Sequence, residues 1–122
     1  MSAATVSLRR VDGVIACERC RVADRALPRM RGLLGRRGLD SGEGLLLKPS
    51  PSIMTFFMRF PIDAVFLDQE GTVLKVRGNL RPWRVAGCRG AHATLELRAG
   101  EASRRGIREG DRLETAESTA TR

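Results

Sequence analysis

The sequence predicts a mainly β (α+β) fold: a compact antiparallel β-barrel or sandwich of about seven to eight short strands with one or two short helices. Short apolar or alternating runs recur along the chain, separated by turn residues such as Asp12-Gly13 and Gly110-Asp111. The 122 residues suffice for one domain with a single core. We assign residues 1–115 to this domain and expect residues 116–122, which are small and polar, to form a disordered tail.

The first third of the chain is expected to hold a hairpin, a helix and a strand. Residues 5–8 and 13–17 form the hairpin around Asp12-Gly13. Asp24 caps a helix over about residues 26–34, where apolar side chains recur at helical spacing. A strand at residues 45–48 then ends at the first of two prolines.

Residues 52–68 are the most apolar stretch and contain all four phenylalanines. Strand alternation places one wholly apolar face in the core: Met54, Phe56, Met58 and Phe60. Pro61 cannot donate to a sheet ladder and is expected to end this first strand. The strand after it, residues 62–67, is apolar on both faces except at Asp63, which predicts a central strand covered on both sides.

The rest of the chain is expected to add further strands and a helical turn. Residues 72–77 alternate and form a hairpin with the preceding strand, near the edge of the sheet. Residues 79–90 are expected to be a loop. A strand at residues 94–98 turns Leu95 and Leu97 inward and Glu96 and Arg98 outward. A helical turn at 100–105 and a last strand at 112–115 complete the domain.

Asp63 is the unusual residue of the central stretch, because an ionised carboxylate in a buried strand is costly unless it is paired or hydrogen-bonded. In one interpretation it accepts backbone N–H groups or pairs with an arginine, and so pins the corner of the sheet. In the other, Asp63 and the preceding Arg59 line a pocket at the strand ends. The pattern of residues leaves both open.

The chain is strongly basic, with a formal net charge of +8, and 20 of its 22 basic residues are arginines. The basic residues are spread along the chain rather than gathered in one block, so they predict attraction to anions in general. No secretory signal and no apolar run long enough to span a bilayer occur. Three cysteines, an odd number, fit reduced thiols. We therefore expect a cytoplasmic protein.

A set of motifs in a fixed order resembles the bacterial and archaeal family called Domain of Unknown Function 192. The N-terminal motifs are RGLLGR at 31–36, GEGLLL at 42–47 and TFFMRFPID at 55–63. The C-terminal motifs are LRPWR at 80–84, LEL at 95–97 and GD at 110–111. The resemblance covers about residues 5–115 and implies a small, compact, β-rich domain without an assigned activity. The family pattern often has histidine where this chain has Met54, and a thioether cannot act as a general base.

Two cysteines in a CxxC, Cys17 and Cys20, together with Cys88 and His92 make a formal Cys₃His set for zinc. The long separation of the two halves and the frequency of cysteines in protein cores argue against this site. We predict neither a metal nor a cofactor.

A nucleic-acid-binding role is a second class of function. Trp83 lies between Arg81 and Arg84, an arrangement suited to base stacking and phosphate contacts. In the alternative interpretation, Trp83 closes the end of the barrel and the arginines are only solvated.

The sequence thus favours a non-enzymatic ligand-binding or accessory module with a polar pocket near Asp63. We expect a small anionic ligand or a partner protein there, and we name five pocket residues: Arg31, Thr55, Met58, Arg59 and Asp63. An uncharacterised enzyme with Asp63 as acid or base is a third class. The motifs of serine hydrolases, P-loops and HExxH metalloproteases are absent, which leaves this class little support.

Overall fold

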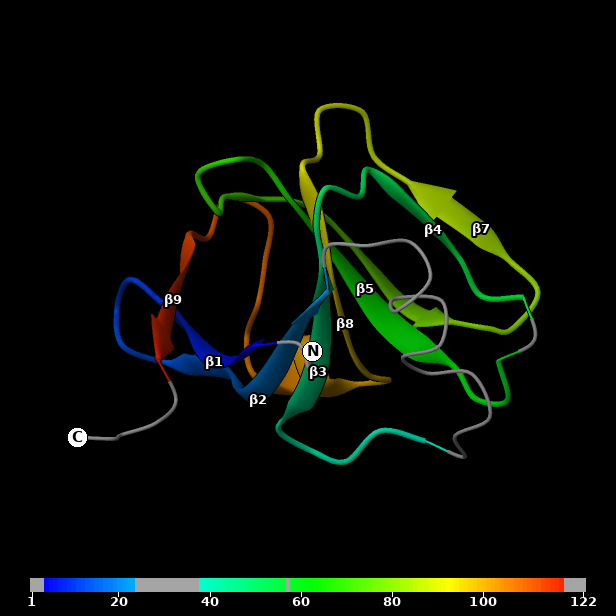
Figure 1. Cartoon of the computed structure of the whole chain (residues 1–122), viewed down its shortest axis with the longest axis horizontal. Coiled ribbons are helices and arrows are strands. Elements are labelled where there is room, and N and C mark those ends of the chain that lie inside the picture. Colours follow the sequence, from blue (N-terminus) through cyan, green and yellow to red (C-terminus); the bar gives the residue numbers. More distant parts are fainter. Residues whose placement is uncertain (1–3, 24–37, 57, 118–122) are drawn as a thin grey trace.

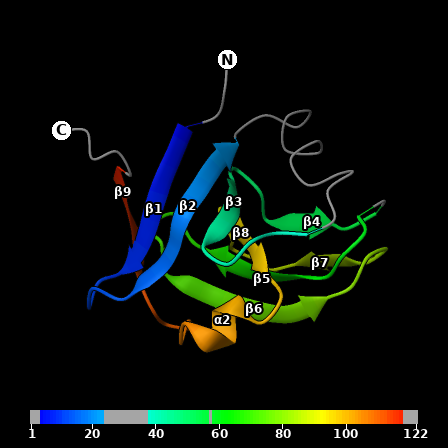
Figure 2. The same ribbon diagram turned by 90° about the horizontal axis from the view of Figure 1, so that it is seen from below.

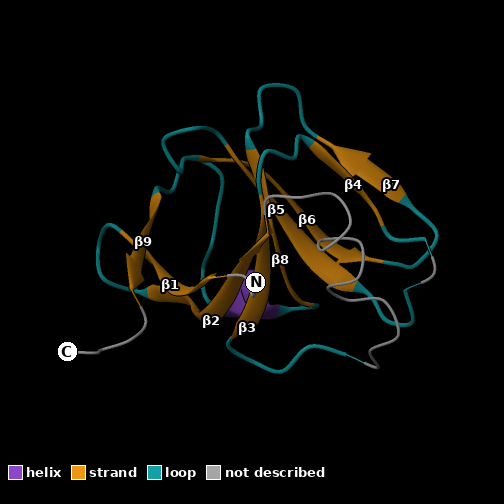
Figure 3. Cartoon of the chain, viewed as in Figure 1, coloured by secondary structure: helices purple, strands orange, loops and turns teal. Residues whose placement is uncertain are grey.

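The computed structural model describes residues 4–23, 38–56 and 58–117. These residues form a sandwich-like β fold, in which a two-stranded ribbon lies over part of a seven-stranded sheet (Figure 1). The strand order of the large sheet is β6-β5-β8-β3-β2-β1-β9, and the ribbon is β4-β7. Figure 3 shows that strands dominate the described part of the chain. The prediction of a mainly β sandwich or barrel is confirmed.

The described residues contain nine strands and one short helix. The strands of the large sheet are β1 (Ala4–Arg10), β2 (Ile15–Ala23), β3 (Glu43–Leu47), β5 (Ile62–Leu67), β6 (Val73–Leu80), β8 (Ala93–Arg98) and β9 (Leu113–Glu117). The ribbon consists of β4 (Ser52–Met54) and β7 (Val85–Gly87), and the helix is α2 (Glu101–Arg104). The helix expected at 26–34 lies outside the described residues, and so do residues 118–122 of the predicted tail.

The large sheet is mixed but mainly antiparallel, with one parallel pair of strands among its antiparallel pairs. Strands β2 and β3 pair in parallel, from Arg19 opposite Glu43 to Ala23 opposite Leu47. A parallel pair needs a connection of about a dozen residues or more, and Ala23 and Glu43 are far enough apart in the sequence to allow one. The sheet also curls: Thr72 before β6 bridges Arg112 before β9, although β6 and β9 belong to opposite ends of the strand order.

Two apolar clusters cover opposite faces of the central strands. In β5, Val65 and Leu67 belong to the first cluster, whereas Ala64 and Phe66 belong to the second. All six residues of β5 are buried, so the prediction of a central strand covered on both sides is confirmed. The antiparallel hairpin of β5 with β6, at one end of the sheet, is confirmed as well.

The prediction that Met54, Phe56, Met58 and Phe60 all face the core is wrong for the first two of them. Only Ser52–Met54 is a strand, and its inward residue is Ile53, while Met54 is 57% exposed and Phe56 38% exposed. The physical reason is a partner that the local pattern does not reveal: β7, a short strand inside the predicted loop 79–90, pairs with β4. The ribbon packs its inner side on the second cluster and leaves Met54 outside. Met58 and Phe60 are buried, as expected.

The helical turn predicted at 100–105 is present as α2, which lies against the sheet close to β6 (Figure 2). Strand β9 continues to Glu117, two residues beyond the predicted end of the domain. No helix in the described part of the chain is long and apolar enough to span a membrane.

Candidate functional site

The cavity beside Asp63 does not bring together the described residues that were predicted to form one pocket. Arg31 lies outside the described residues. Asp63 lines a cavity of about 450 Å³ between the end of β6 and α2, together with Gly78, Gly100, Ser103 and Arg108. Among the described residues, the lining of this cavity does not include Thr55, Met58 or Arg59.

The carboxylate of Asp63 connects three elements of this region by hydrogen bonds. Its carboxylate is buried and accepts three backbone N–H groups, from Asn79 at 2.9 Å, Gly100 at 3.0 Å and Ala102 at 2.9 Å. These bonds tie β5 to the end of β6 and to the first turn of α2, whose own N-cap residue, Gly100, supplies no side-chain cap. Both oxygens are engaged, which favours the interpretation that Asp63 pins the corner. The side chain of Arg59 is exposed.

Thr55 fixes the loop that follows β6 by hydrogen bonds. Its hydroxyl donates to the carbonyl of Arg81 at 2.7 Å and accepts the backbone N–H of Arg84 at 2.9 Å. Its backbone N–H donates to the carbonyl of Arg84, and its carbonyl accepts the N–H of Trp83. Four hydrogen bonds from one buried residue therefore fix the loop at residues 81–84 against the end of β4.

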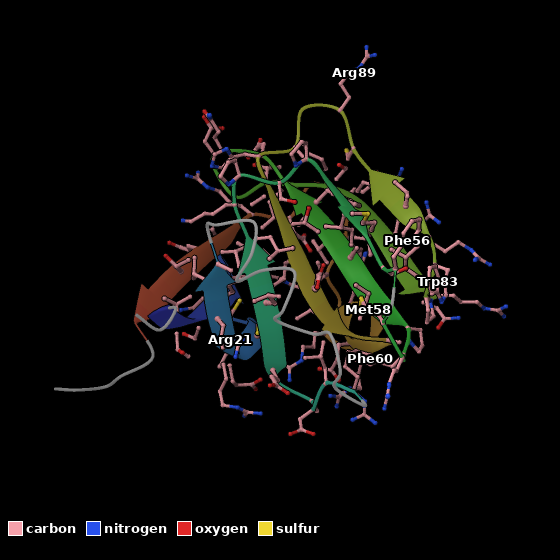
Figure 4. The ribbon with its side chains drawn as sticks, turned by 45° about the vertical axis from the view of Figure 1, so that its right-hand side comes forward. Arg21, Phe56, Met58, Phe60, Trp83 and Arg89 are labelled. Atoms are coloured by element: carbon pink, nitrogen blue, oxygen red, sulfur yellow. The ribbon has the colours of Figure 1, made fainter. Side chains whose placement is uncertain are left out.

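Trp83 is held in a strained conformation and presented to solvent. Its φ of 65° is in the left-handed region, which costs a residue with a side chain about 1–3 kcal/mol. The side chain is 55% exposed and packs on Phe56, with ring centroids 5.3 Å apart and ring planes 32° apart (Figure 4). Such exposure does not fit the interpretation that Trp83 closes the end of the barrel.

The outer face of the ribbon is apolar. Met54 of β4 pairs with Val85 of β7, and both side chains are exposed, whereas Ile53 and Ala86 form the buried pair of the inner face. Phe56 follows Met54 by two residues, and Trp83 precedes Val85 by two residues. Both aromatic side chains are exposed and extend the same row. These four residues are a majority of the seven large hydrophobic side chains that the described residues expose.

The two segments that contain the strands of the ribbon carry charge of one sign. All 14 acidic residues lie outside segments 44–62 and 71–95, whereas these two segments carry seven of the 22 basic residues. The pairing of β4 with β7 brings the two segments together. Arg81 and Arg84 are exposed and make no ion pair with any described residue. We call Met54, Phe56, Arg81, Trp83, Arg84 and Val85 the aromatic–arginine surface.

Sequence reasoning singled out Arg81, Trp83 and Arg84 but missed Met54, Phe56 and Val85. One feature of the sequence could have indicated this surface. The basic residues are spread along the chain, but the acidic residues are missing from segments 44–62 and 71–95. The distribution of carboxylates, rather than that of arginines, marks this surface.

The Thr55→Val variant tests whether the hydroxyl of Thr55 fixes the loop at residues 81–84. Losing the hydroxyl leaves the Arg84 N–H and the Arg81 carbonyl without their partner, and we expect a loss of about 1–3 kcal/mol in the free energy of unfolding. We also expect acrylamide to quench Trp83 fluorescence more strongly, because the loop loosens. Thr115→Val, an exposed position on β9, is the matched control. Unchanged stability and quenching in Thr55→Val would contradict the bracing role.

The three cysteines that were considered for zinc together with His92 lie on different sides of the sheet. Cys17 and Cys20 are buried in the first cluster, while Cys88 packs against the second. A bulge opposite Ser7 turns both β2 cysteines inward, and the hydrogen bond between their thiols raises the pKa of Cys20, as does its burial. The described residues contain no group of three side chains placed to hold a metal ion.

Glu96 corrects a further expectation, since the alternation of β8 predicted that it points outward. It is buried in the middle of the sheet, opposite Leu45 of β3 and Ala64 of β5, because both faces of β8 are covered. Burial raises the pKa of its carboxyl to about 7.

Comparisons with known proteins give a family and a fold. The model of the Domain of Unknown Function 192 family, described as an uncharacterized ACR, matches residues 8–115. A crystal structure from Sinorhizobium meliloti 1021, described as a "putative transcription regulator", is 26% identical, with a TM-score of 0.82 over 94% of this chain and 96% of that one. A protein of unknown function from Novosphingobium aromaticivorans DSM 12444 is 24% identical, with a TM-score of 0.77 over 90% of this chain and 83% of that one.

No functionally curated protein matches the chain. The family model covers nearly the whole sequence and most of the strands described above. The chain belongs to the Domain of Unknown Function 192 family.

Proposed function

We propose that this protein is a non-enzymatic binding module, that its binding site is the aromatic–arginine surface, and that its partner is anionic. One observation carries the proposal: the exposed apolar row of the ribbon lies where two segments without any carboxylate meet. Large apolar side chains gathered on an exposed face are typical of interaction sites. Arg81 and Arg84 form no ion pair with any described residue, which leaves them available to an anion.

The rigidity of the site supports a binding role. Trp83 and its neighbours are fixed by Thr55 before any partner arrives, so little conformational entropy is lost when a partner binds. Tryptophan and arginine are also the residue types that contribute most to binding energy at interfaces. A strained backbone that exposes an aromatic ring costs stability, and such strain is concentrated at functional sites.

The cavity beside Asp63 is a second candidate place, for a small anionic ligand. Arg108 is the only cation among the described residues of its lining. An acid or base role for Asp63 has weaker support, because three N–H donors already engage its oxygens. The free thiols of Cys17, Cys20 and Cys88 fit a reducing compartment such as the cytoplasm.

Binding to inorganic polyphosphate tests the proposal, with two variants of equal charge. Arg81→Ala with Arg84→Ala removes two cations from the surface. Arg9→Ala with Arg21→Ala removes two exposed cations from β1 and β2, and Figure 4 places Arg21 far from Trp83. By isothermal titration at about 0.1 M salt, we expect the first variant to lose affinity about tenfold and the second much less. Equal losses in both variants would contradict the proposal.

A further inference from the structure

We infer that the anionic partner of the aromatic–arginine surface is a single-stranded nucleic acid, with bases stacked on Phe56 and Trp83 and phosphates against Arg81 and Arg84. This inference rests on the function proposed above and adds the chemical class of the partner. It combines a feature that any polyanion would use, the arginines, with one that only planar groups use, the paired rings.

The two rings form a platform on a sheet face. Phe56 and Trp83 project from the ends of the two strands of the ribbon onto its outer side, 5.3 Å apart and tilted by 32° (Figure 4). Both are partly exposed, and the apolar side chains of Met54 and Val85 continue the row. Proteins that bind single strands use aromatic side chains on sheet surfaces in this way, because every base offers a flat face for stacking.

The arginines are placed to follow the sugar–phosphate chain past the rings. Arg81 and Arg84 flank Trp83 in one short loop, and all three are exposed. Nη1 of Arg84 lies within 3.5 Å of the carbonyls of Pro82 and Trp83, to which it donates, and these bonds hold the guanidinium against the backbone of the loop that carries Trp83. The ion pairs of the described residues occupy Arg10, Arg104 and Arg105 instead, in other parts of the fold.

A duplex would use the arginines but not the rings, because its base faces are already stacked inside the helix. An anionic membrane would also attract this surface, but insertion requires apolar side chains that reach below the charged groups. Here Arg81 and Arg84 lie within two residues of Trp83 in the same loop, so ring and charges meet the partner together. The observations favour a single strand over both alternatives.

The test is fluorescence anisotropy of a labelled dT12 oligonucleotide with the full chain. Trp83→Ala is expected to weaken binding about tenfold or more, because loss of one stacking platform has that size. Trp83→Phe keeps a ring and is expected to retain most of the affinity, which separates stacking from a change in the fold. Arg81→Ala with Arg84→Ala is expected to weaken binding and to flatten its salt dependence, whereas Arg9→Ala with Arg21→Ala does neither. Trp83 emission is expected to fall as dT12 binds.

A 12-base-pair duplex and vesicles of phosphatidylcholine with 30% phosphatidylserine separate this inference from the function on which it rests. Equal affinity for the duplex, or dT12 binding that survives Trp83→Ala in a folded protein, would overturn the inference. Vesicle binding that depends on Trp83, without binding of dT12, would overturn it as well. In each of these cases binding that still depends on Arg81 and Arg84 preserves the proposed function. If polyphosphate, dT12 and vesicles all fail to bind, or bind with no dependence on these arginines, both proposals fall.

Discussion

Replacing Asp63 by alanine is expected to lower the free energy of unfolding by about 3 kcal/mol. Three backbone N–H groups lose the carboxylate that accepts them, and each buried donor left without a partner costs about 1–3 kcal/mol. The loss of α2 anchoring and the disruption of the β5–β6 corner have the same origin. Urea unfolding followed by circular dichroism measures the change.

Asp63→Asn and Glu109→Ala complete this experiment. Asparagine keeps one oxygen acceptor but places an NH₂ group against backbone donors, so we expect a loss close to that of alanine. Glu109 is exposed, and its removal is expected to change stability by less than about 0.5 kcal/mol. If Asp63→Ala keeps its stability but loses a ligand of the adjoining cavity, Asp63 is a binding residue and not a structural one.

Glu96→Gln is expected to make the protein more stable at pH 8 and to leave its stability nearly unchanged at pH 4. Burial raises the pKa of Glu96 to about 7 from an ordinary value of 4.5. The folded state therefore holds a proton that the unfolded state releases, and wild-type stability falls as the pH rises through this window. The full difference is about 3 kcal/mol, at 1.36 kcal/mol per pKa unit.

The comparison across pH isolates Glu96 from the other carboxyl groups. Unfolding of the wild type and of Glu96→Gln at pH 4, 5, 6, 7 and 8 gives the difference between the two directly. Glu114→Gln, at an exposed position of β9, is the matched control and is expected to follow the wild type. A constant difference between Glu96→Gln and the wild type across this range would show that Glu96 does not bind a proton on folding.

The strands that local patterns define were predictable. The hairpin of β5 and β6 has alternation, a turn and a charged outer strand, and the burial of residues 62–67 follows from their apolar character on both faces. Pairing across long separations was not predictable. The parallel contact of β2 with β3 and the pairing of β4 with β7 depend on how distant segments meet, which no window of sequence records.

Two residues show why the candidate site was only partly predictable. Phe56 reads as core because it is large, apolar and in phase with Met58 and Phe60, yet the chain turns after β4 and leaves it on the outer face. Glu96 reads as surface because charged residues usually face water, yet a second layer covers its side of β8. In both cases the covering element, rather than the strand itself, decides which face is exposed.

A nuclear magnetic resonance titration tests most directly whether the outer face of the ribbon is the binding surface. The amide spectrum of the full ¹⁵N-labelled chain is recorded with increasing inorganic polyphosphate. We predict that the largest shift changes occur at β4, β7, the loop 81–84 and the indole N–H of Trp83, the only tryptophan. Changes concentrated on β1 and β2, or spread evenly over all exposed arginines, would contradict the account.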